Sequence, residues 1–351
     1  MAVTELNAPS FPLPESFRCL WVERMENGTI RRSLASRPLH ELPPGEVLIR
    51  TAYSSLNYKD ALAANGHPGV VRRFPHIPGV DAAGTVVRCE TPDFAPGDAV
   101  VVTGYEMGAG RWGGYSEYVR VPREWVLPLP DALSFVDAMT YGTAGLTAAM
   151  CVQTLLDHGI TPEKGEVVVT GASGGVGSVA VAVLAKLGFR VTAVTGKPQA
   201  VPLLRSLGAA DFLSRGDVQD ASEKPLLSGR WAGAVDTVGG RVLTTVLRSL
   251  KHGGCAAACG LAGGNRLEMT VYPFILRAVT LAGIDAAYAA PELKRRMWSL
   301  LAGPWRVDRL AELRRVLTLE SLEPYFGEIP AGNATGRLVI EIGGDVAPGG
   351  V

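Results

Sequence analysis

A glycine-rich turn between two apolar segments is the part of this sequence with the clearest chemical meaning. Residues 167–170 read VVVT, residues 171–177 read GASGGVG, and residues 178–187 are mostly small or aliphatic. Such glycines permit a tight turn, let the backbone approach a pyrophosphate, and allow a helix and a strand to pack closely. Free N–H groups at the positive end of the following helix would bind the phosphates. We therefore predict a dinucleotide site here, with a purely structural turn as the alternative.

The residues after the next apolar segment, 190–194, bear on the choice of cofactor. In many dinucleotide sites an acidic residue about 20 positions after the glycines binds the ribose 2′-hydroxyl. This sequence instead has Thr195, Gly196 and Lys197 there, and Arg215 follows. A lysine and a hydroxyl would attract a 2′-phosphate, which a carboxylate would repel. NADPH is therefore predicted in preference to NADH; a solvated lysine at a strand end is the alternative.

The potential metal ligands lack the spacing of a metal site. No Cys-x-x-Cys pair occurs, and His67 and His76 have no acidic or cysteine partners at ligand spacing. Cys255 and Cys259 lie in the small-residue segment GGCAAACG, which is more typical of packing than of a ligand pair. Zinc dehydrogenases use their metal as a Lewis acid on a carbonyl. We therefore predict no metal, and simple alcohol oxidation is disfavoured.

Composition limits the class of partner. With 351 residues, 47% of them hydrophobic, the chain is long enough for two domains. Lys plus Arg is 34 and Asp plus Glu is 34, so a nucleic-acid partner is not indicated. Five scattered cysteines suit a reducing compartment, apolar stretches are interrupted before about 20 residues, and no secretory signal is apparent. We expect a cytoplasmic protein that is not bound to a membrane and acts on a small molecule.

The predicted secondary structure changes along the chain, and its two parts would position these residues. Short strands separated by turns run from residue 17 to about 121, with a short helix at 58–64, which predicts a β-rich, barrel-like domain. From about residue 134 strands and helices alternate, which predicts an open parallel sheet. After residue 291 we expect helices at 293–301 and 309–318 and a final strand at 336–342. The predicted divisions are a tail (1–16), the β-rich domain (17–137), a dinucleotide-binding domain (138–290), a return to the first domain (291–343) and a C-terminal tail (344–351).

Several blocks together resemble the medium-chain dehydrogenase/reductase superfamily over about residues 17–343. They are IPGVDAAG (77–84), FAPGDAV (94–100), GTAGLTA (142–148) and GASGGVG (171–177). Zinc-dependent members have a His-Glu pair where this chain has Val80 and Asp81, and the four-cysteine lobe is absent, so the chain resembles the zinc-free quinone oxidoreductase branch. The blocks NYKD (57–60), GYEMG (104–108), WGGYSEY (112–118) and CGLAGG (259–264) resemble the acryloyl-CoA reductases more narrowly.

This resemblance implies an α/β fold, with a Rossmann doubly wound parallel sheet and a GroES-like β-barrel-type catalytic domain. It also implies NADPH-dependent reduction of acryloyl-CoA to propionyl-CoA, in which hydride adds to the β-carbon and a proton to the α-carbon. An NADPH-dependent quinone or enal reductase of the same branch is the alternative, and a non-catalytic NADPH-binding protein is a third possibility. Dimers are usual on this fold, so a homodimer is expected.

The resemblance also implies roles for individual residues. Tyr58 and Asn57 are the candidate catalytic residues, and Tyr58 is expected to touch the nicotinamide or relay a proton; Asn57 as a helix cap is the alternative. An Arg pair at 72–73 is a candidate for the CoA phosphates, with a solvated pair as the alternative. The predicted cofactor ligands are Ser173, Gly174, Gly175 and Val176 at the pyrophosphate, Thr195, Gly196 and Lys197 at the 2′-phosphate, Arg215 at the adenosine, Leu261 and Ile275 at the nicotinamide half, and Asn333.

Overall fold

The computed structural model describes residues 13–343, which form two compact units. The first unit comprises residues 13–143, 315–333 and 338–343, and the second comprises residues 144–314 and 334–337. These boundaries differ from the predicted divisions, because residues 291–314 belong to the second unit. The predicted C-terminal tail and most of the predicted N-terminal tail lie outside the described residues.

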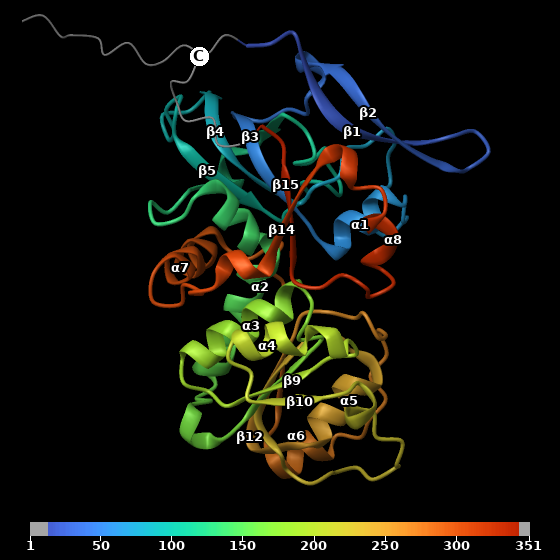
Figure 1. Ribbon diagram of the computed structural model, residues 1–351, viewed down its shortest axis with the longest axis vertical. Helices are drawn as coiled ribbons and strands as arrows, with labels where there is room; N and C mark the ends of the chain where they lie inside the picture. Colours follow the sequence, from blue (N-terminus) through green and yellow to red (C-terminus); the bar gives the residue numbers. More distant parts are fainter. Residues whose placement is uncertain (1–12, 344–351) are drawn as a thin grey trace, which may run out of the picture. The chain divides into compact units, whose positions relative to one another are not determined.

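The first unit is built on an antiparallel sheet in the order β14-β15-β3-β4-β5-β7, with β6 also paired to β3. A separate hairpin of β1 and β2 projects from this unit and is blue in Figure 1. Val47, Ile49, Val86, Val100 and Val119 form part of the buried core. The strands are β1 (Ser16–Arg24), β2 (Ile30–Pro38), β3 (Val47–Leu56), β4 (Asp81–Cys89), β5 (Ala99–Thr103), β6 (Tyr118–Val121), β7 (Val126–Pro128), β14 (Arg314–Thr318) and β15 (Arg337–Glu341).

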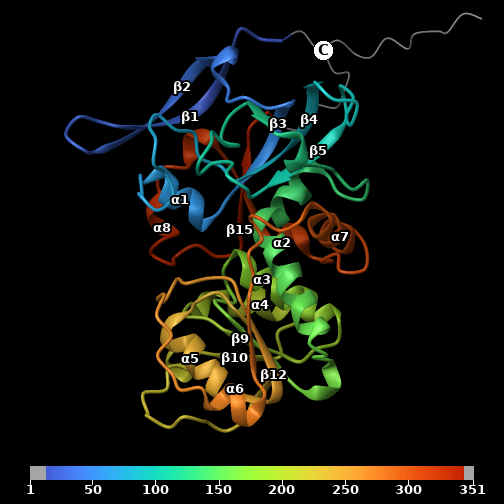
Figure 2. The same cartoon turned by 180° about the vertical axis from the view of Figure 1, so that it is seen from behind.

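Two short helices of the first unit, α1 (Tyr58–Ala64) and α8 (Tyr325–Glu328), lie side by side in both views (Figure 1 and Figure 2). The Asn65 side chain joins them by donating to the Phe326 carbonyl at 2.7 Å. Helix α1 begins with a capping box formed by Asn57 and Asp60. The 3-10 turns of this unit are η1 (Leu39–Glu41), η2 (Arg123–Trp125) and η7 (Leu319–Ser321).

The chain passes from the first unit to the second within α2 (Phe135–Asp157). This helix is interrupted at Gly142, whose φ of 50° and ψ of −156° are not helical. A side chain rarely adopts a positive φ, so glycine suits this position. The interruption comes one residue before Thr143, where the first segment of the first unit ends.

The second unit contains a six-stranded parallel sheet in the order β10-β9-β8-β11-β12-β13. Successive strands extend away from β8 on one side and from β11 on the other, so the order reverses between these two strands. Ligands of open α/β sheets bind at such a switch point, outside the carboxyl ends of the strands. The strands are β8 (Val167–Thr170), β9 (Val191–Val194), β10 (Asp211–Leu213), β11 (Trp231–Asp236), β12 (Leu250–Ala258) and β13 (Thr280–Gly283). The predicted α/β class is confirmed.

The helices of the second unit connect consecutive strands of this sheet, except the last helix, which follows β13. They are α3 (Gly175–Lys186), α4 (Val201–Ser206), α5 (Gly240–Arg248), α6 (Tyr272–Arg277) and α7 (Pro291–Ala302), with the 3-10 turns η3 (Pro162–Lys164), η4 (Pro198–Ala200), η5 (Gly216–Val218) and η6 (Leu310–Leu313). Trp231, Val242, Val246 and Leu247 are buried where α5 packs against the sheet. The amphipathic pattern of α5 explains this burial, since its apolar residues recur on one face.

The predicted helix at 309–318 is wrong. Residues Leu310–Leu313 form the turn η6, and Arg314–Thr318 form strand β14, which is hydrogen-bonded to β15. The apolar residues of this segment are spaced as in a helix, but a neighbouring strand edge provides a partner for the extended backbone. Tertiary pairing therefore overrides the local pattern.

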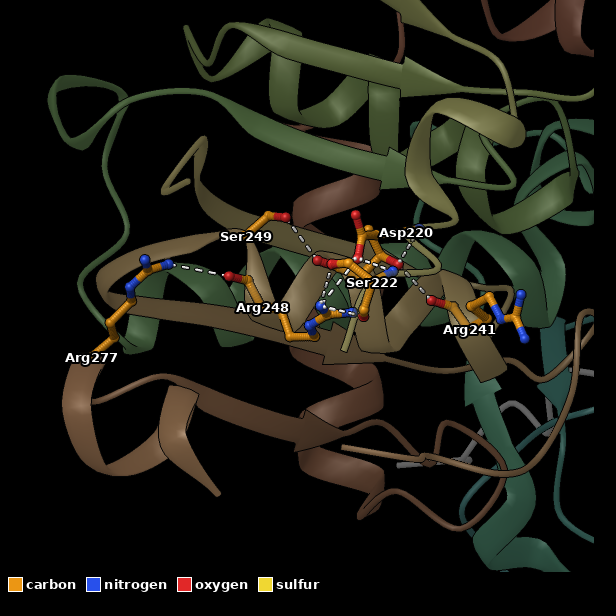
Figure 3. A network of polar contacts seen from close by, with 7 residues as sticks. Asp220, Ser222, Arg241, Arg248, Ser249 and Arg277 are labelled. Atoms are coloured by element: carbon orange, nitrogen blue, oxygen red, sulfur yellow. Dashed lines mark hydrogen bonds and ion pairs between the residues drawn. The ribbon is translucent and has the colours of Figure 1, made fainter. Parts of the chain in front are cut away.

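Two arginines hold the long connection between β10 and β11 (Figure 3). Arg248, at the end of α5, is only 6% exposed and donates to the Asp220 carboxylate at 3.1 Å and to the Ser222 carbonyl at 2.9 Å. Arg277, at the end of α6, donates to the Arg248 carbonyl at 3.1 Å and to the Leu227 carbonyl at 2.6 Å. Together with the Leu227 N–H, which donates to the Arg248 carbonyl at 2.9 Å, these bonds join the ends of α5 and α6 to the loop before β11.

Candidate active-site residues

The glycine turn of the second unit has the geometry of a phosphate-binding loop. Gly171 has a φ of +59°, and Gly174 is the N-cap of α3 with an extended backbone. A Cβ on Gly177 would lie 2.4 Å from the Gly171 carbonyl oxygen, so this glycine permits close packing of the helix on the strand. The free N–H groups of the first turn of α3 are therefore available for an anion.

A buried arginine lies against the start of the same helix. Arg337 is 2% exposed, and its Nη1 atom would be 2.8 Å from a Cβ on Gly175. The segment before it is fixed by the Gly336 N–H, which donates to the Ser173 carbonyl at 2.9 Å. A guanidinium beside the positive end of a helix adds to the positive potential there, which favours an anion. These residues therefore fit a pyrophosphate, and Arg337 is a candidate ligand that our sequence reasoning missed.

The residues after β9 form a second cationic position. The Thr195 hydroxyl donates to the Ser173 hydroxyl at 2.9 Å, and the Lys197 N–H donates to the Thr195 hydroxyl oxygen at 3.1 Å. The Lys197 Nζ donates to the Ala334 carbonyl. Arg215 Nη2 would be 3.5 Å from a Cβ on Gly196.

Burial lowers the pKa of Lys197, and the positive charge of Arg215 lowers it further. Two cations therefore lie close enough to repel each other, at the end of a strand next to the glycine turn. A bound phosphate would relieve that repulsion. This arrangement fits the 2′-phosphate of NADPH better than a 2′-hydroxyl.

The remaining predicted cofactor residues lie at separate places in the two units. Val176 is half-buried in the first turn of α3. Leu261 follows β12 and is 59% exposed, whereas Ile275 on α6 is 71% exposed. Asn333 belongs to the first unit, where its N–H donates to the Glu328 carbonyl at 2.9 Å. Their contacts with a cofactor stay predictions.

Both predicted catalytic residues belong to the start of α1 in the first unit. Tyr58 is the first residue of the helix and is 41% exposed. The Asn57 side-chain amide donates to Asp81 Oδ2 at 2.8 Å, to Asp60 Oδ2 at 3.1 Å and to Ser55 Oγ at 3.2 Å. The alternative reading of Asn57 as a helix cap is therefore the one that its contacts favour.

Two buried carboxyl groups surround this amide, and both were missed in the sequence. Asp60 and Asp81 are each 0% exposed. Burial raises the pKa of Asp60 to about 7, and the negative charge of Asp81 contributes to the rise. Their only sequence signal was their place in the blocks NYKD and IPGVDAAG.

The described residues do not fit a metal centre. Between residues 13 and 343 no group of three or more His, Cys, Asp and Glu side chains is arranged to hold a metal ion. His76 Nε2 donates to the Gly108 carbonyl oxygen at 3.0 Å, and burial lowers the pKa of this histidine. His67 accepts a hydrogen bond from the Gly69 N–H at 3.1 Å.

Among the described helices, none combines the length and the apolar character that a membrane crossing requires.

Comparison with known proteins connects the two units to one superfamily. The model "Alcohol dehydrogenase GroES-like domain" matches residues 43–131, and the model "Zinc-binding dehydrogenase" matches residues 175–303. Acrylyl-CoA reductase AcuI of Ruegeria pomeroyi is 44% identical over 93% of this chain and 99% of its own length.

Solved structures agree with this relationship. The yhdH oxidoreductase of Salmonella enterica in complex with NADP is 45% identical with a TM-score of 0.90, and covers 93% of this chain and 99% of that one. The Bacillus subtilis protein yhfP with NAD bound is 43% identical with a TM-score of 0.90, at the same coverage. The chain therefore belongs to the medium-chain dehydrogenase/reductase superfamily.

Proposed function

We propose that this protein is an NADPH-dependent reductase of a short 2-enoyl-CoA thioester, with acryloyl-CoA as its first substrate and propionyl-CoA as the product. The observation that carries the proposal is the 44% identity to an acrylyl-CoA reductase over 93% of the chain. The blocks NYKD, GYEMG, WGGYSEY and CGLAGG, dispersed over residues 57–264, support the same conclusion.

The cofactor proposal is supported by the cations of the second unit. The N–H groups of Gly175 and Val176, in the first turn of α3, and the guanidinium of Arg337 would bind the pyrophosphate. Lys197 and Arg215 would bind the 2′-phosphate. Two solved relatives were crystallised with NADP or NADPH, and a third with NAD. When bound, NADPH supplies the hydride.

The substrate chemistry requires no metal. A thioester makes the β-carbon of an enoyl group electrophilic, so hydride adds there and negative charge develops on the thioester oxygen. Hydrogen-bond donors stabilise that charge, and a proton must reach the α-carbon. We propose Tyr58, exposed at the start of α1, as the side chain that touches the reacting groups, with water as an alternative proton source. Asn57 then acts by holding Tyr58, since its amide is occupied by neighbouring residues.

A homodimer formed through the second unit completes the proposal. Five large apolar side chains in this region are exposed, namely Val271 (61%), Tyr272 (48%), Ile275 (71%), Leu276 (58%) and Tyr288 (62%). Strand β13 is an edge strand of the six-stranded sheet, and it lies close in sequence to these side chains. An apolar patch beside an open edge supports self-association.

The five free cysteines support a reducing compartment, the cytoplasm.

Steady-state kinetics test the proposed activity. We expect NADPH oxidation with acryloyl-CoA to be fastest, crotonyl-CoA to be slower by about 10-fold for one extra methyl group, and free acrylate to be very poor because it lacks the binding energy of CoA. A quinone turned over faster than acryloyl-CoA would make the protein a quinone reductase, and activity that depends on stoichiometric zinc would refute the metal-free chemistry. Light scattering tests the dimer, and Leu276→Glu should yield a monomer.

A further inference from the structure

We propose that Asp81 is a positioning residue for the reduction, which fixes the first turn of α1 and thereby the side chain of Tyr58. The inference rests on the proposed role of Tyr58 at the reacting groups. The Asp81 carboxylate is the centre of a buried hydrogen-bond network in the first unit.

Asp81 joins three segments that are far apart in the sequence. Its carboxylate accepts hydrogen bonds from the Ser55 hydroxyl at 2.5 Å, at the end of β3, and from the Asn57 amide at 2.8 Å, at the cap of α1. It also accepts from the Thr143 hydroxyl at 2.5 Å and from the Thr143 N–H at 3.0 Å. Thr143 directly follows the interruption of α2 at Gly142.

A second carboxyl group ties the same turn to the segment that leads into Asp81. Asp60 Oδ2 accepts from the Asn57 N–H at 2.8 Å. Its Oδ1 atom accepts from the Val80 N–H at 2.8 Å and from the Gly79 N–H at 3.2 Å. The first turn of α1 is therefore bonded both to the side chain of Asp81 and to the backbone of the two residues before it. All these groups lie inside the first unit.

Tyr58 is the residue that this network orients. It follows Asn57 directly and begins the helix, so a rotation of the turn would redirect its side chain. The ring is 41% exposed, so packing alone restrains it less than a core residue. Catalytic geometry is sensitive on this scale, because a misplacement of about 1 Å can lower a rate by about 100-fold. Residues that lock a functional side chain are thus expected beneath it.

The network suits a carboxylate better than a neutral amide of the same size. All four groups directed at Asp81 are donors, and an ionised carboxylate accepts with both oxygens. An asparagine has one accepting oxygen, and its NH₂ group would face donors. Asp81→Asn keeps the volume and shape but breaks part of the network, which makes it the informative substitution.

The test measures kcat, KM and cofactor binding in Asp81→Asn. We expect kcat for the NADPH-dependent reduction to fall by about 10- to 100-fold, because the reacting geometry is disturbed. The Kd for NADPH should change by less than about threefold, since the phosphate-binding residues belong to the second unit. Asp98→Asn is the matched control: Asp98 also accepts a backbone N–H at 2.8 Å, from Ala95 in an exposed turn of the first unit. This control should keep wild-type kcat.

A double-mutant cycle separates positioning from general stabilisation. If Asp81 acts through Tyr58, Asp81→Asn should have no further effect on kcat in the Tyr58→Ala background. Effects that multiply, or an unchanged kcat in a folded Asp81→Asn protein, would overturn the inference. Should Asp81→Asn fail to fold, Ser55→Ala removes one donor to Asp81 and is judged by the same cycle, with an expected loss of about threefold or more.

Failure of the proposed substrate would be seen separately, in wild-type protein that does not reduce acryloyl-CoA. In that case the cycle is measured with whichever acceptor the wild type reduces with NADPH.

Discussion

Replacement of Lys197 by alanine should convert the protein from an NADPH enzyme to one that scarcely distinguishes the two cofactors. The Lys197 ammonium has three donors, of which one contacts the Ala334 carbonyl, so others remain for a 2′-phosphate. A charge-assisted hydrogen bond is worth about 1.5–3 kcal/mol, and each 1.4 kcal/mol is tenfold in affinity. Because Lys197 is only half-buried, solvent screening favours the lower part of this range.

We therefore expect the KM for NADPH to rise by about 10- to 30-fold in Lys197→Ala, while the KM for NADH changes by less than about threefold. The pH dependence should follow the same residue. Burial and the charge of Arg215 lower the pKa of Lys197, so NADPH affinity should fall as pH rises through that lowered pKa. Deprotonated Lys197 no longer attracts the phosphate, and the variant should lack this part of the profile.

The assay is steady-state kinetics with each cofactor varied at saturating acryloyl-CoA. Lys186→Ala is the matched control, because Lys186 lies in the same unit and is paired with Asp308 at 2.7 Å. Its removal should leave both KM values unchanged. The reasoning is refuted if the wild type uses NADH as efficiently as NADPH, or if Lys197→Ala raises both KM values equally.

Three further predictions follow from buried or fixed polar groups. The pKa of Asp60 is raised from 3.8 to about 7, so protonated Asp60 contributes stability below about pH 4 that is lost as pH rises to about 7. In urea unfolding, Asp60→Asn should lack this loss of stability. Free energies of unfolding that change with pH in parallel in the variant and the wild type would contradict the prediction. Arg277→Met removes three bonds to carbonyls and should lower the free energy of unfolding of the second unit by about 2 kcal/mol, whereas the exposed control Arg266→Met should not, as denaturant titration can show. Burial raises the pKa of Cys19 to about 12 and of Cys255 to about 11, so both thiols stay protonated. Peptide mass mapping after exposure to acryloyl-CoA, a thiol-reactive compound, should find neither thiol alkylated, and rapid adducts at either would be the contrary result.

Local spacing was sufficient to predict the α/β class, and the resemblance of several sequence blocks indicated the superfamily; both are confirmed. The turn 171–177 is informative because glycine is needed where the backbone itself must turn and approach a ligand, and Lys197 is informative because charge alone separates a 2′-phosphate from a 2′-hydroxyl. These features depend on residues close together in the chain, so a sequence can display them. The roles assigned to Tyr58, Leu261, Ile275 and Asn333 stay predictions.

The tertiary structure decided what depends on distant segments. Arg337 reaches the start of α3 from far along the chain, and Asp81 meets Asn57 and Thr143 only because β3, β4 and α2 converge within the first unit. The segment 314–318 is a strand because β15 lies beside it, although its apolar spacing is helical. A sequence lists donors and acceptors, but which of them become partners is set by long-range packing, and burial then determines their pKa values and their chemical roles.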